Sequence, residues 1–201
     1  MRTITTVAFR LNARSGDARL PALLAMSDRA RLPDPVPFLR RFPRRAALVF
    51  RGGDAARGWA ARAACRRLGV PFFWAGAAAE ARFLSADGLH LRDDAAARQR
   101  EARAWRRHGG ALLFAAAHGP RAVRAAAAAG ADAVLLSPVF PTASHPGAPA
   151  IGISRFRAWA RAAGVPVYAL GGVTPKTARA LVSTPCVGIA GIDWVLALRG
   201  A

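Results

Sequence analysis

Short apolar runs alternate with longer stretches rich in alanine and arginine along almost the whole chain. The apolar runs have the length of strands, and the stretches between them have the length of helices. The pattern predicts strands at residues 22–26, 46–51, 70–75, 86–91, 111–116, 132–137, 165–170 and 186–192. It predicts helices at residues 35–42, 54–68, 76–85, 94–108, 119–129, 152–163 and 174–183, with a last turn near 193–199.

The predicted strands are apolar along nearly their whole length instead of alternating between apolar and polar residues. Strands of this kind are buried on both faces, as in parallel sheets covered by helices. Eight strand–helix units predict an α/β protein, a single (β/α)8 TIM barrel over residues 1–201. A doubly wound open sheet is the alternative. Residues 1–20 precede the first strand as an N-terminal extension, either a short element over the bottom of the barrel or a partly disordered segment.

Composition narrows the class of protein. Hydrophobic residues make up 53% of the 201 residues, enough for one sizeable core. No apolar stretch reaches the roughly 18 residues of a membrane-spanning helix, and the first residues lack the apolar segment of a secretory signal. The two cysteines have no metal-ligand neighbours at the usual spacing. We therefore expect a cytoplasmic protein with two buried free thiols and no membrane partner.

Arginine dominates the charge of the chain. Lysine and arginine together number 30 against 11 aspartates and glutamates, which gives a formal net charge of +19, and Lys176 is the only lysine. Such a charge attracts polyanions. The arginines are nevertheless spread along the chain beside alanines, without a compact basic arm or interleaved aromatic residues. We read them as solvated helix faces and expect no specific nucleic-acid partner.

The loop after the sixth predicted strand is the most informative segment for function. In a (β/α)8 barrel the active site is formed by loops that follow the carboxyl ends of the strands. This loop, SPVFPTASHPGAPAIG, is long and proline-rich, and its polar groups include Thr142, Ser144 and His145. A long loop in a compact barrel is usually functional. We therefore expect these side chains to face a ligand.

Two further loops at the same end carry groups suited to an anion. Gly171 and Gly172 lie between the seventh strand and the next helix, where backbone N–H groups can approach a phosphate closely. Phosphate sites after the seventh and eighth strands recur in this fold. Arg51 ends an apolar strand at the predicted mouth, so we expect it to bind an anion.

Several segments resemble the thiamine phosphate synthase and TenI family. The run GADAVLLSPVFPTASHPG at residues 130–147 resembles the family pattern GADYvgfGPvFpTxTK. The runs PVYALGGVTPKTA and GIAGI resemble the patterns PvvAIGGI and GVAvvSai, and SDRARLP, ADGLHL and AAAHGPRAVRAAAAAGAD resemble earlier family segments more loosely. The resemblance covers residues 22–196 in order.

The resemblance implies a (β/α)8 barrel that acts in thiamine biosynthesis. The family's synthase joins hydroxymethylpyrimidine diphosphate to thiazole phosphate with Mg²⁺ and releases pyrophosphate. Its partners are therefore small phosphorylated heterocycles, and both a monomer and a homo-oligomer are left open. The resemblance, together with the loop positions, assigns substrate binding to Arg51, Thr142, Ser144, His145, Gly171, Gly172 and Asp193.

The chain departs from the family pattern at five ligand positions. The second strand keeps the family's Arg but lacks its Gln and Lys, and the third strand ends without the family's metal-binding Asp. After the fourth strand, Asp93 or Asp94 matches the family's Asp only after a shift. His145 replaces a diphosphate-binding Lys, and Asp193 replaces a Ser near the thiazole phosphate, where a carboxylate repels phosphate unless it is neutralised. The sequence assigns no metal ligand and leaves Mg²⁺ open.

His118 supports an alternative reaction. TenI relatives include a thiazole tautomerase, which moves a proton on thiazole phosphate without a metal or a diphosphate, and its acid/base is a His after the fifth strand. His118 matches that position, and histidine suits proton transfer near neutral pH. We predict the synthase reaction as the activity. The alternatives are the tautomerase reaction, with His118 as catalytic residue, and a non-catalytic barrel that binds such ligands.

Overall fold

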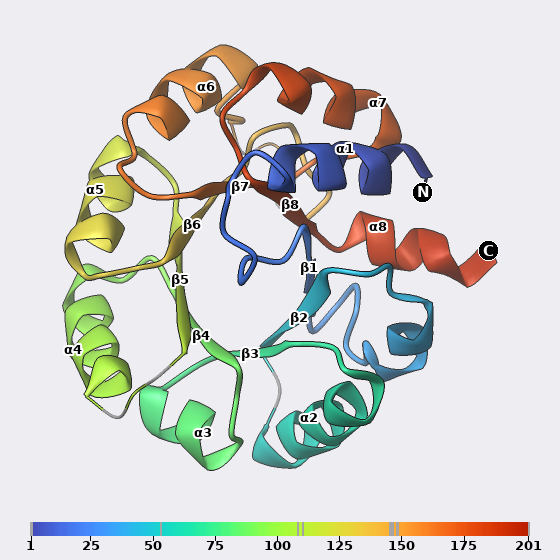
Figure 1. Cartoon of the computed structure of the whole chain (residues 1–201), viewed down its shortest axis with the longest axis vertical. Helices are drawn as coiled ribbons and strands as arrows, with labels where there is room; N and C mark the ends of the chain where they lie inside the picture. Colours follow the sequence, from blue (N-terminus) through green and yellow to red (C-terminus); the bar gives the residue numbers. More distant parts are fainter. Residues whose placement is uncertain are drawn as a thin grey trace.

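The computed structural model describes residues 2–52, 54–107, 109, 111–144, 147 and 149–200. Its parallel strands close into a barrel in chain order, with the helices outside (Figure 1). The strands are β1 Leu23–Met26, β2 Ala46–Arg51, β3 Phe72–Ala75, β4 Gly88–Leu91, β5 Leu112–Ala117, β6 Ala133–Leu136, β7 Val167–Leu170 and β8 Gly188–Gly191. All eight fall within or beside the predicted runs, so the predicted (β/α)8 barrel is confirmed. The open-sheet alternative is wrong, because β1 pairs with both β2 and β8.

The outer layer also follows the predicted ranges. The helices are α1 Arg2–Asn12, α2 Ala55–Leu68, α3 Ala78–Phe83, α4 Ala95–Arg106, α5 Pro120–Ala128, α6 Ile153–Arg161, α7 Pro175–Ala178 and α8 Asp193–Leu196. The 3-10 helices are η1 Val36–Arg41, η2 Arg179–Ser183 and η3 Ala197–Gly200. Residues 35–42 therefore form a tight 3-10 turn instead of an α-helix, with Pro at its start. No helix in the described ranges is long and apolar enough to cross a membrane.

The stretch before the first strand forms a helix that packs beside the last strand of the barrel. Helix α1 lies beside α7 and next to β8, at the blue end of the chain (Figure 1). Asn12 at its end is buried and donates from Nδ2 to the carbonyls of Leu20, Pro21 and Val187, at 3.1 to 3.3 Å. These carbonyls lie just before β1 and β8. Of the two predictions for residues 1–20, the structure shows the extra element over the bottom.

Large aromatic rings fill the barrel interior because glycines stand opposite them. Phe73 and Phe114 stack with ring centroids 4.5 Å apart, and Tyr168 lies 5.6 Å from Phe114. A Cβ on Gly88 would lie 2.2 Å from the Phe73 ring, and one on Gly188 would lie 2.5 Å from Tyr168. Atoms cannot approach so closely, so both strands need glycine at these positions. The interior is thus packed with side chains, and chemistry is confined to the ends of the barrel.

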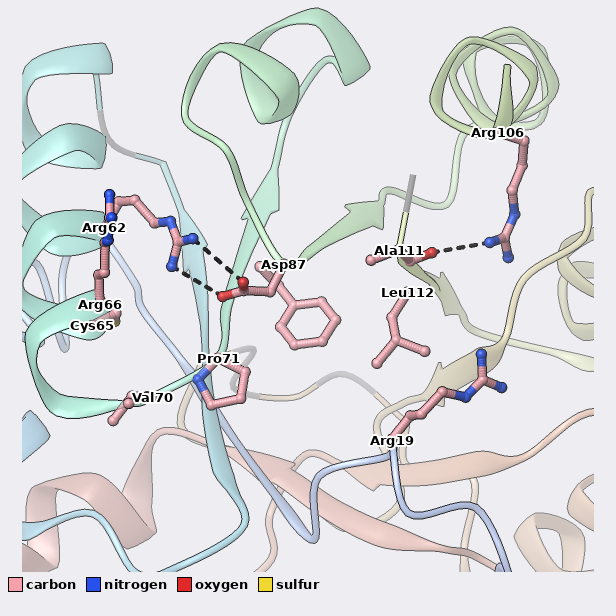
Figure 2. Close-up of a pocket in the computed structure, with 12 residues that line it drawn as sticks. Arg19, Arg62, Cys65, Arg66, Val70, Pro71, Asp87, Arg106, Ala111 and Leu112 are labelled. Atoms are coloured by element: carbon pink, nitrogen blue, oxygen red, sulfur yellow. Dashed lines mark hydrogen bonds and ion pairs between the residues drawn. The ribbon is translucent and has the colours of Figure 1, made fainter. Parts of the chain in front are cut away.

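Two similar contacts tie the bottom of the barrel together. Asp87, before β4, accepts from the backbone N–H of Phe72 at 2.8 Å and pairs with Arg62 at 3.1 Å (Figure 2). Asp132, before β6, accepts from the backbone N–H of Leu113 at 2.7 Å and pairs with Arg106 at 2.6 Å. Each carboxylate thus joins the start of the preceding strand to an arginine of the outer layer. The Asp in ADGLHL and in GADAVLL is structural.

A pocket of about 710 Å³ lies at this same bottom end (Figure 2). Its wall contains Arg62 and Arg106, which are held by the contacts just described, and Arg19, which pairs with Asp17 at 2.8 Å. Val70, Pro71 and Leu112 add apolar surface, and the buried, unpaired Cys65 also lines it. Burial raises the pKa of the Cys65 thiol to about 12, so the thiol stays protonated. The pocket is far along the strands from the loops that carry the predicted site.

Candidate functional site

The predicted site residues follow the carboxyl ends of five strands. Arg51 ends β2, His118 follows β5, Thr142 and Ser144 lie in the loop after β6, Gly171 and Gly172 follow β7, and Asp193 opens α8 after β8. His145 lies outside the described residues. In a closed parallel barrel these ends meet around one mouth, so the topology brings the described members of the set to the same end.

The loop after β6 packs directly on the diglycine turn after β7. The N–H of Val139 donates to Leu170 at 2.9 Å, and the N–H of Phe140 donates to Gly171 at 3.1 Å. Gly171 and Gly172 have φ values of 93° and 65°, which favour glycine. A Cβ on Gly172 would lie 2.3 Å from the carbonyl oxygen of Pro141. Both glycines are therefore required by close packing of two loops, whatever ligand they bind.

Backbone N–H groups at this turn are available for a ligand. Thr174 opens α7, its N–H bonded to Thr177 at 2.8 Å. The N–H groups of Gly172 and Val173 donate to no other described residue. Consecutive free N–H groups beside a glycine turn form a concave donor set that suits an anion. That Gly172 binds a phosphate stays a prediction.

Arg31 neutralises the carboxylate that was predicted to repel phosphate. From the loop after β1, its Nη2 contacts Oδ1 of Asp193, and its Nη1 donates to Ser144 Oγ at 3.1 Å. The loops after β1, β6 and β8 are thereby joined across the mouth. Sequence analysis missed Arg31, although it lies in the motif SDRARLP, because its partners are 113 and 162 residues away.

Arg51 is held by the neighbouring strand. Its Nε donates to the carbonyl of Ser27 at 2.9 Å, its backbone N–H donates to Ser27 Oγ at 2.6 Å, and its Nη2 lies 3.5 Å from Oδ2 of Asp28. Burial lowers the pKa of the Arg51 guanidinium, with Asp28 acting in the opposite direction. The guanidinium is half-exposed, so it can still face an anion, but part of its donor set serves the loop after β1.

Asp28 completes that arrangement. Burial favours a raised pKa for the Asp28 carboxyl, but donors from the Arg31 and Ala30 backbone, together with the charge of Arg51, outweigh burial and lower the pKa. Both N–H donors lie 3.0 Å from Oδ1. The carboxylate is therefore ionised and fixes the backbone that carries Arg31.

His118 contacts Ser137 through Nδ1, which lies 3.3 Å from the Ser137 hydroxyl oxygen. Its Nδ1 lies 2.9 Å from the carbonyl oxygen of Ser137, at the start of the loop after β6. Because a carbonyl oxygen only accepts, Nδ1 carries the hydrogen in this contact. In the neutral ring Nε2 is then the unprotonated nitrogen, and no described residue hydrogen-bonds to it. His118 is exposed, so a ligand in the mouth can reach a nitrogen that is ready to accept a proton.

His90 contrasts with His118. It points into the barrel from β4, is buried, and places Nδ1 3.0 Å from the carbonyl of Leu91. Burial, reinforced by the positive charges of Arg51 and Arg92, lowers the pKa of His90 to about 3. It is therefore a neutral interior histidine. Trp74 is likewise structural, because it stacks on Phe50 with centroids 5.8 Å apart and donates to Glu80 at 2.9 Å.

The described acidic residues of the mouth do not form a Mg²⁺ site. Asp93 pairs with Arg98, whose side chain is only 2% exposed, and Asp94 caps α4 by accepting from the N–H of Ala97 at 3.1 Å. Asp28 and Asp193 are each paired with arginine. No group of three or more His, Cys, Asp or Glu that could hold a metal occurs among the described residues. Asp93 and Asp94, which match the family's Asp only after a shift in the alignment, thus already have structural partners.

The fold is a (β/α)8 barrel, and among the described residues of its mouth His118 is the exposed histidine. Comparison with known proteins gives the family. The chain belongs to the thiamine monophosphate synthase family, which it matches over residues 55–195. This confirms the resemblance inferred from the motifs.

Relatives agree with this assignment. Thiamine-phosphate synthase of Azoarcus sp. (strain BH72) is 38% identical over 152 residues, which cover 73% of this chain and 69% of that protein. The enzyme of that name from Bacillus velezensis is 33% identical over 132 residues, 64% of this chain and 57% of that protein. The chain spans about half the length of the curated relatives that it matches, from 43% to 59% in five of them.

A solved structure supports the fold. Thiamine phosphate pyrophosphorylase from Pyrococcus furiosus superimposes with a TM-score of 0.68 at 23% identity, covering 89% of this chain and 87% of that chain. At this identity the likeness concerns the barrel alone.

Proposed function

We propose that this barrel acts in thiamine phosphate synthesis by binding thiazole phosphate at its mouth, with His118 as the group that moves a proton. The observation that carries the proposal is the His118–Ser137 contact, which leaves Nε2 unprotonated and accessible. The free N–H groups of Gly172 and Val173 supply donors for the phosphate.

The proton transfer needs only groups that the described residues supply. Nε2 of His118 takes a proton from one atom of the thiazole and returns it to another, so no atoms are gained or lost. While the ring is protonated, Nδ1–H keeps its bond to the Ser137 carbonyl, which holds the imidazolium in place. A positioned acid/base of this kind contributes typically about 100- to 10,000-fold in rate.

The coupling reaction named by the relatives is the second candidate. In it the thiazole nitrogen forms a bond to the pyrimidine methylene carbon while the bond to pyrophosphate breaks and the leaving group takes the electron pair. Family membership favours this reaction. The acidic residues do not fit Mg²⁺, so we derive no step through that ion, and the geometry supports the proton transfer better.

The first experiment measures thiazole tautomerisation in solution. We expect His118→Gln to lower the turnover rate at least about 100-fold while the dissociation constant for thiazole phosphate changes less than about 3-fold. Arg124→Gln, on the exposed face of α5, is the matched control and should behave like the native chain. Unchanged turnover in His118→Gln would show that His118 is not the acid/base.

The second experiment separates the two reactions. Purified protein is supplied with thiazole phosphate and pyrimidine diphosphate, with Mg²⁺ or with chelator, and thiamine phosphate is quantified. We expect tautomerisation but no thiamine phosphate in either case. Formation of thiamine phosphate that requires Mg²⁺ would establish the coupling reaction instead. If calorimetry detects no binding of thiazole phosphate, both candidate functions fail.

A further inference from the structure

Arg31, Ser144 and Asp193 form a contact set across the mouth that we call the clasp. Arg31 comes from the loop after β1, Ser144 from the loop after β6, and Asp193 from the first turn of α8. The guanidinium contacts both other side chains, so it is the shared element. It lies at the same mouth as the N–H of Gly172, which donates to no other described residue.

The backbone that carries Arg31 is fixed. Asp28 and Leu32 exchange two backbone hydrogen bonds of 3.0 Å, which close a tight turn around residues 29–31. Oδ1 of Asp28 accepts from the N–H of Arg31 at 3.0 Å. The start of the side chain is therefore held in place, while the guanidinium at its end can exchange partners.

Solvent reaches the clasp. The side chains of Arg31 and Asp193 are 25% and 41% exposed, so the pair is neither sealed nor fully hydrated. An incoming anion can compete for the guanidinium without unfolding a loop. In contrast, the Arg98 side chain is 2% exposed and cannot exchange its partner in this way.

The donors of Arg31 are already divided. Nη2 faces Asp193 and Nη1 faces Ser144, while Nε has no acceptor among the described residues. A phosphate prefers two parallel donors of one guanidinium. Any such pair on Arg31 includes at least one nitrogen that now faces Asp193 or Ser144, so a bound phosphate has to share or replace these contacts.

We infer that Arg31 recognises the phosphate of the ligand and that Asp193 is a built-in competitor for the same guanidinium. The phosphate displaces the carboxylate, and the affinity for phosphate is set below the value that a free Arg31 would give. The chain has a carboxylate where the family pattern has Ser, and Arg31, which neutralises it, lies in a loop at the same mouth as Gly172. This inference rests on the proposed binding of thiazole phosphate at the mouth.

A double-mutant cycle tests the inference. Native protein, Asp193→Asn, Arg31→Gln and the double variant are titrated by calorimetry with thiazole phosphate, with the corresponding thiazole alcohol and with pyrophosphate. Asp17→Asn is the matched control, since it raises the net charge by the same amount and breaks the exposed Arg19–Asp17 pair at the other end of the barrel. Circular dichroism and thermal melting verify that each variant folds.

We expect Asp193→Asn to tighten binding of thiazole phosphate and pyrophosphate about 10-fold, corresponding to the loss of one competing charged contact. Affinity for the alcohol should not change. Arg31→Gln should weaken binding of both anions, and the double variant should resemble Arg31→Gln, because the competitor matters only through Arg31. Asp17→Asn should leave all three affinities near the native values.

Two results would overturn the inference. One is native or weaker anion affinity in Asp193→Asn, which would make the clasp a purely structural tie. The other is equal pyrophosphate affinity in all four members of the cycle. If no variant binds thiazole phosphate but pyrophosphate follows the expected order, the proposed function fails while the role of Arg31 stands.

Discussion

Removing either partner of the Arg98–Asp93 pair should destabilise the barrel, and by unequal amounts. Arg98, in α4, is 2% exposed and reaches the carbonyls of Ala116 and Ala122 at 3.4 Å, while its Nε has no hydrogen-bond partner in the described part of the chain. Asp93 is 24% exposed, so water can hydrate its carboxylate if the arginine is lost. The buried charge is the arginine.

The loss in the free energy of unfolding depends on which charged group is left without its partner. Breaking a buried pair by removing one partner costs about 3–5 kcal/mol, mostly from the uncompensated charge. Asp93→Asn strands the buried guanidinium, although the amide oxygen still accepts a hydrogen bond, so we expect a loss near the lower end, about 3 kcal/mol. Arg98→Met keeps an apolar stem of similar length and leaves a carboxylate that water reaches, so we expect about 1 kcal/mol.

Urea unfolding at pH 7, followed by circular dichroism, measures both losses as changes in the free energy of unfolding. The loss in Asp93→Asn should persist in 1 M NaCl, because salt screens buried charges weakly. A larger loss in Arg98→Met than in Asp93→Asn would refute the argument that the unpaired, buried guanidinium of Arg98 is the costlier of the two charges. Losses below about 0.5 kcal/mol in both variants would show that the pair is not effectively buried.

Three further predictions concern the barrel interior. Burial lowers the pKa of His90 to about 3, so between that pH and about 6.5 the unfolded chain binds more protons than the folded one. Stability should therefore fall as pH drops from 7 to 5, by up to about 1.4 kcal/mol per pH unit, and His90→Gln should flatten this slope in urea titrations. Gly188→Ala places a Cβ 2.5 Å from Tyr168 and should lower the free energy of unfolding by about 3 kcal/mol. Gly119→Ala is the control, because its added Cβ meets nothing within 4 Å, and it should cost less than about 1 kcal/mol. Equal losses in the two variants would contradict the packing argument. Tyr168→Phe removes a 2.6 Å hydrogen bond to the carbonyl of Pro21 and should lower the free energy of unfolding by about 1 kcal/mol. A higher free energy of unfolding in this variant would mean that the hydrogen bond does not stabilise the barrel.

The strands could be predicted because their signal is local. Each one is a run of mostly buried residues, and several begin after turn residues, as at Gly69-Val70-Pro71 before β3. Helix α2 could be predicted for the same reason, and Asp54 caps it by accepting from the N–H of Arg57 at 2.8 Å. Helix type was harder to predict, since residues 36–41 form a 3-10 helix with Pro near its start where the sequence predicted an α-helix.

The mouth could be located from the sequence, but its contacts could not be assigned. Loop positions placed Arg51, His118 and Asp193 at one end, because strand ends are readable. The Arg31–Asp193 pair joins loops that are 162 residues apart in the sequence. The local pattern carries no information on such pairs, and a chain with 30 basic residues offers too many candidates.

Those pairs change the chemistry that the mouth can support. Asp28 pairs with Arg51, Asp93 with Arg98 and Asp193 with Arg31. All three carboxylates thus already balance a guanidinium charge, and separating Asp93 from Arg98 would leave a buried charge without its partner. The charges of these carboxylates are balanced by guanidinium groups, which suits the proposed ligand with a single phosphate. The proposed proton transfer by His118 fits this charge balance, since that reaction needs one phosphate site and one base.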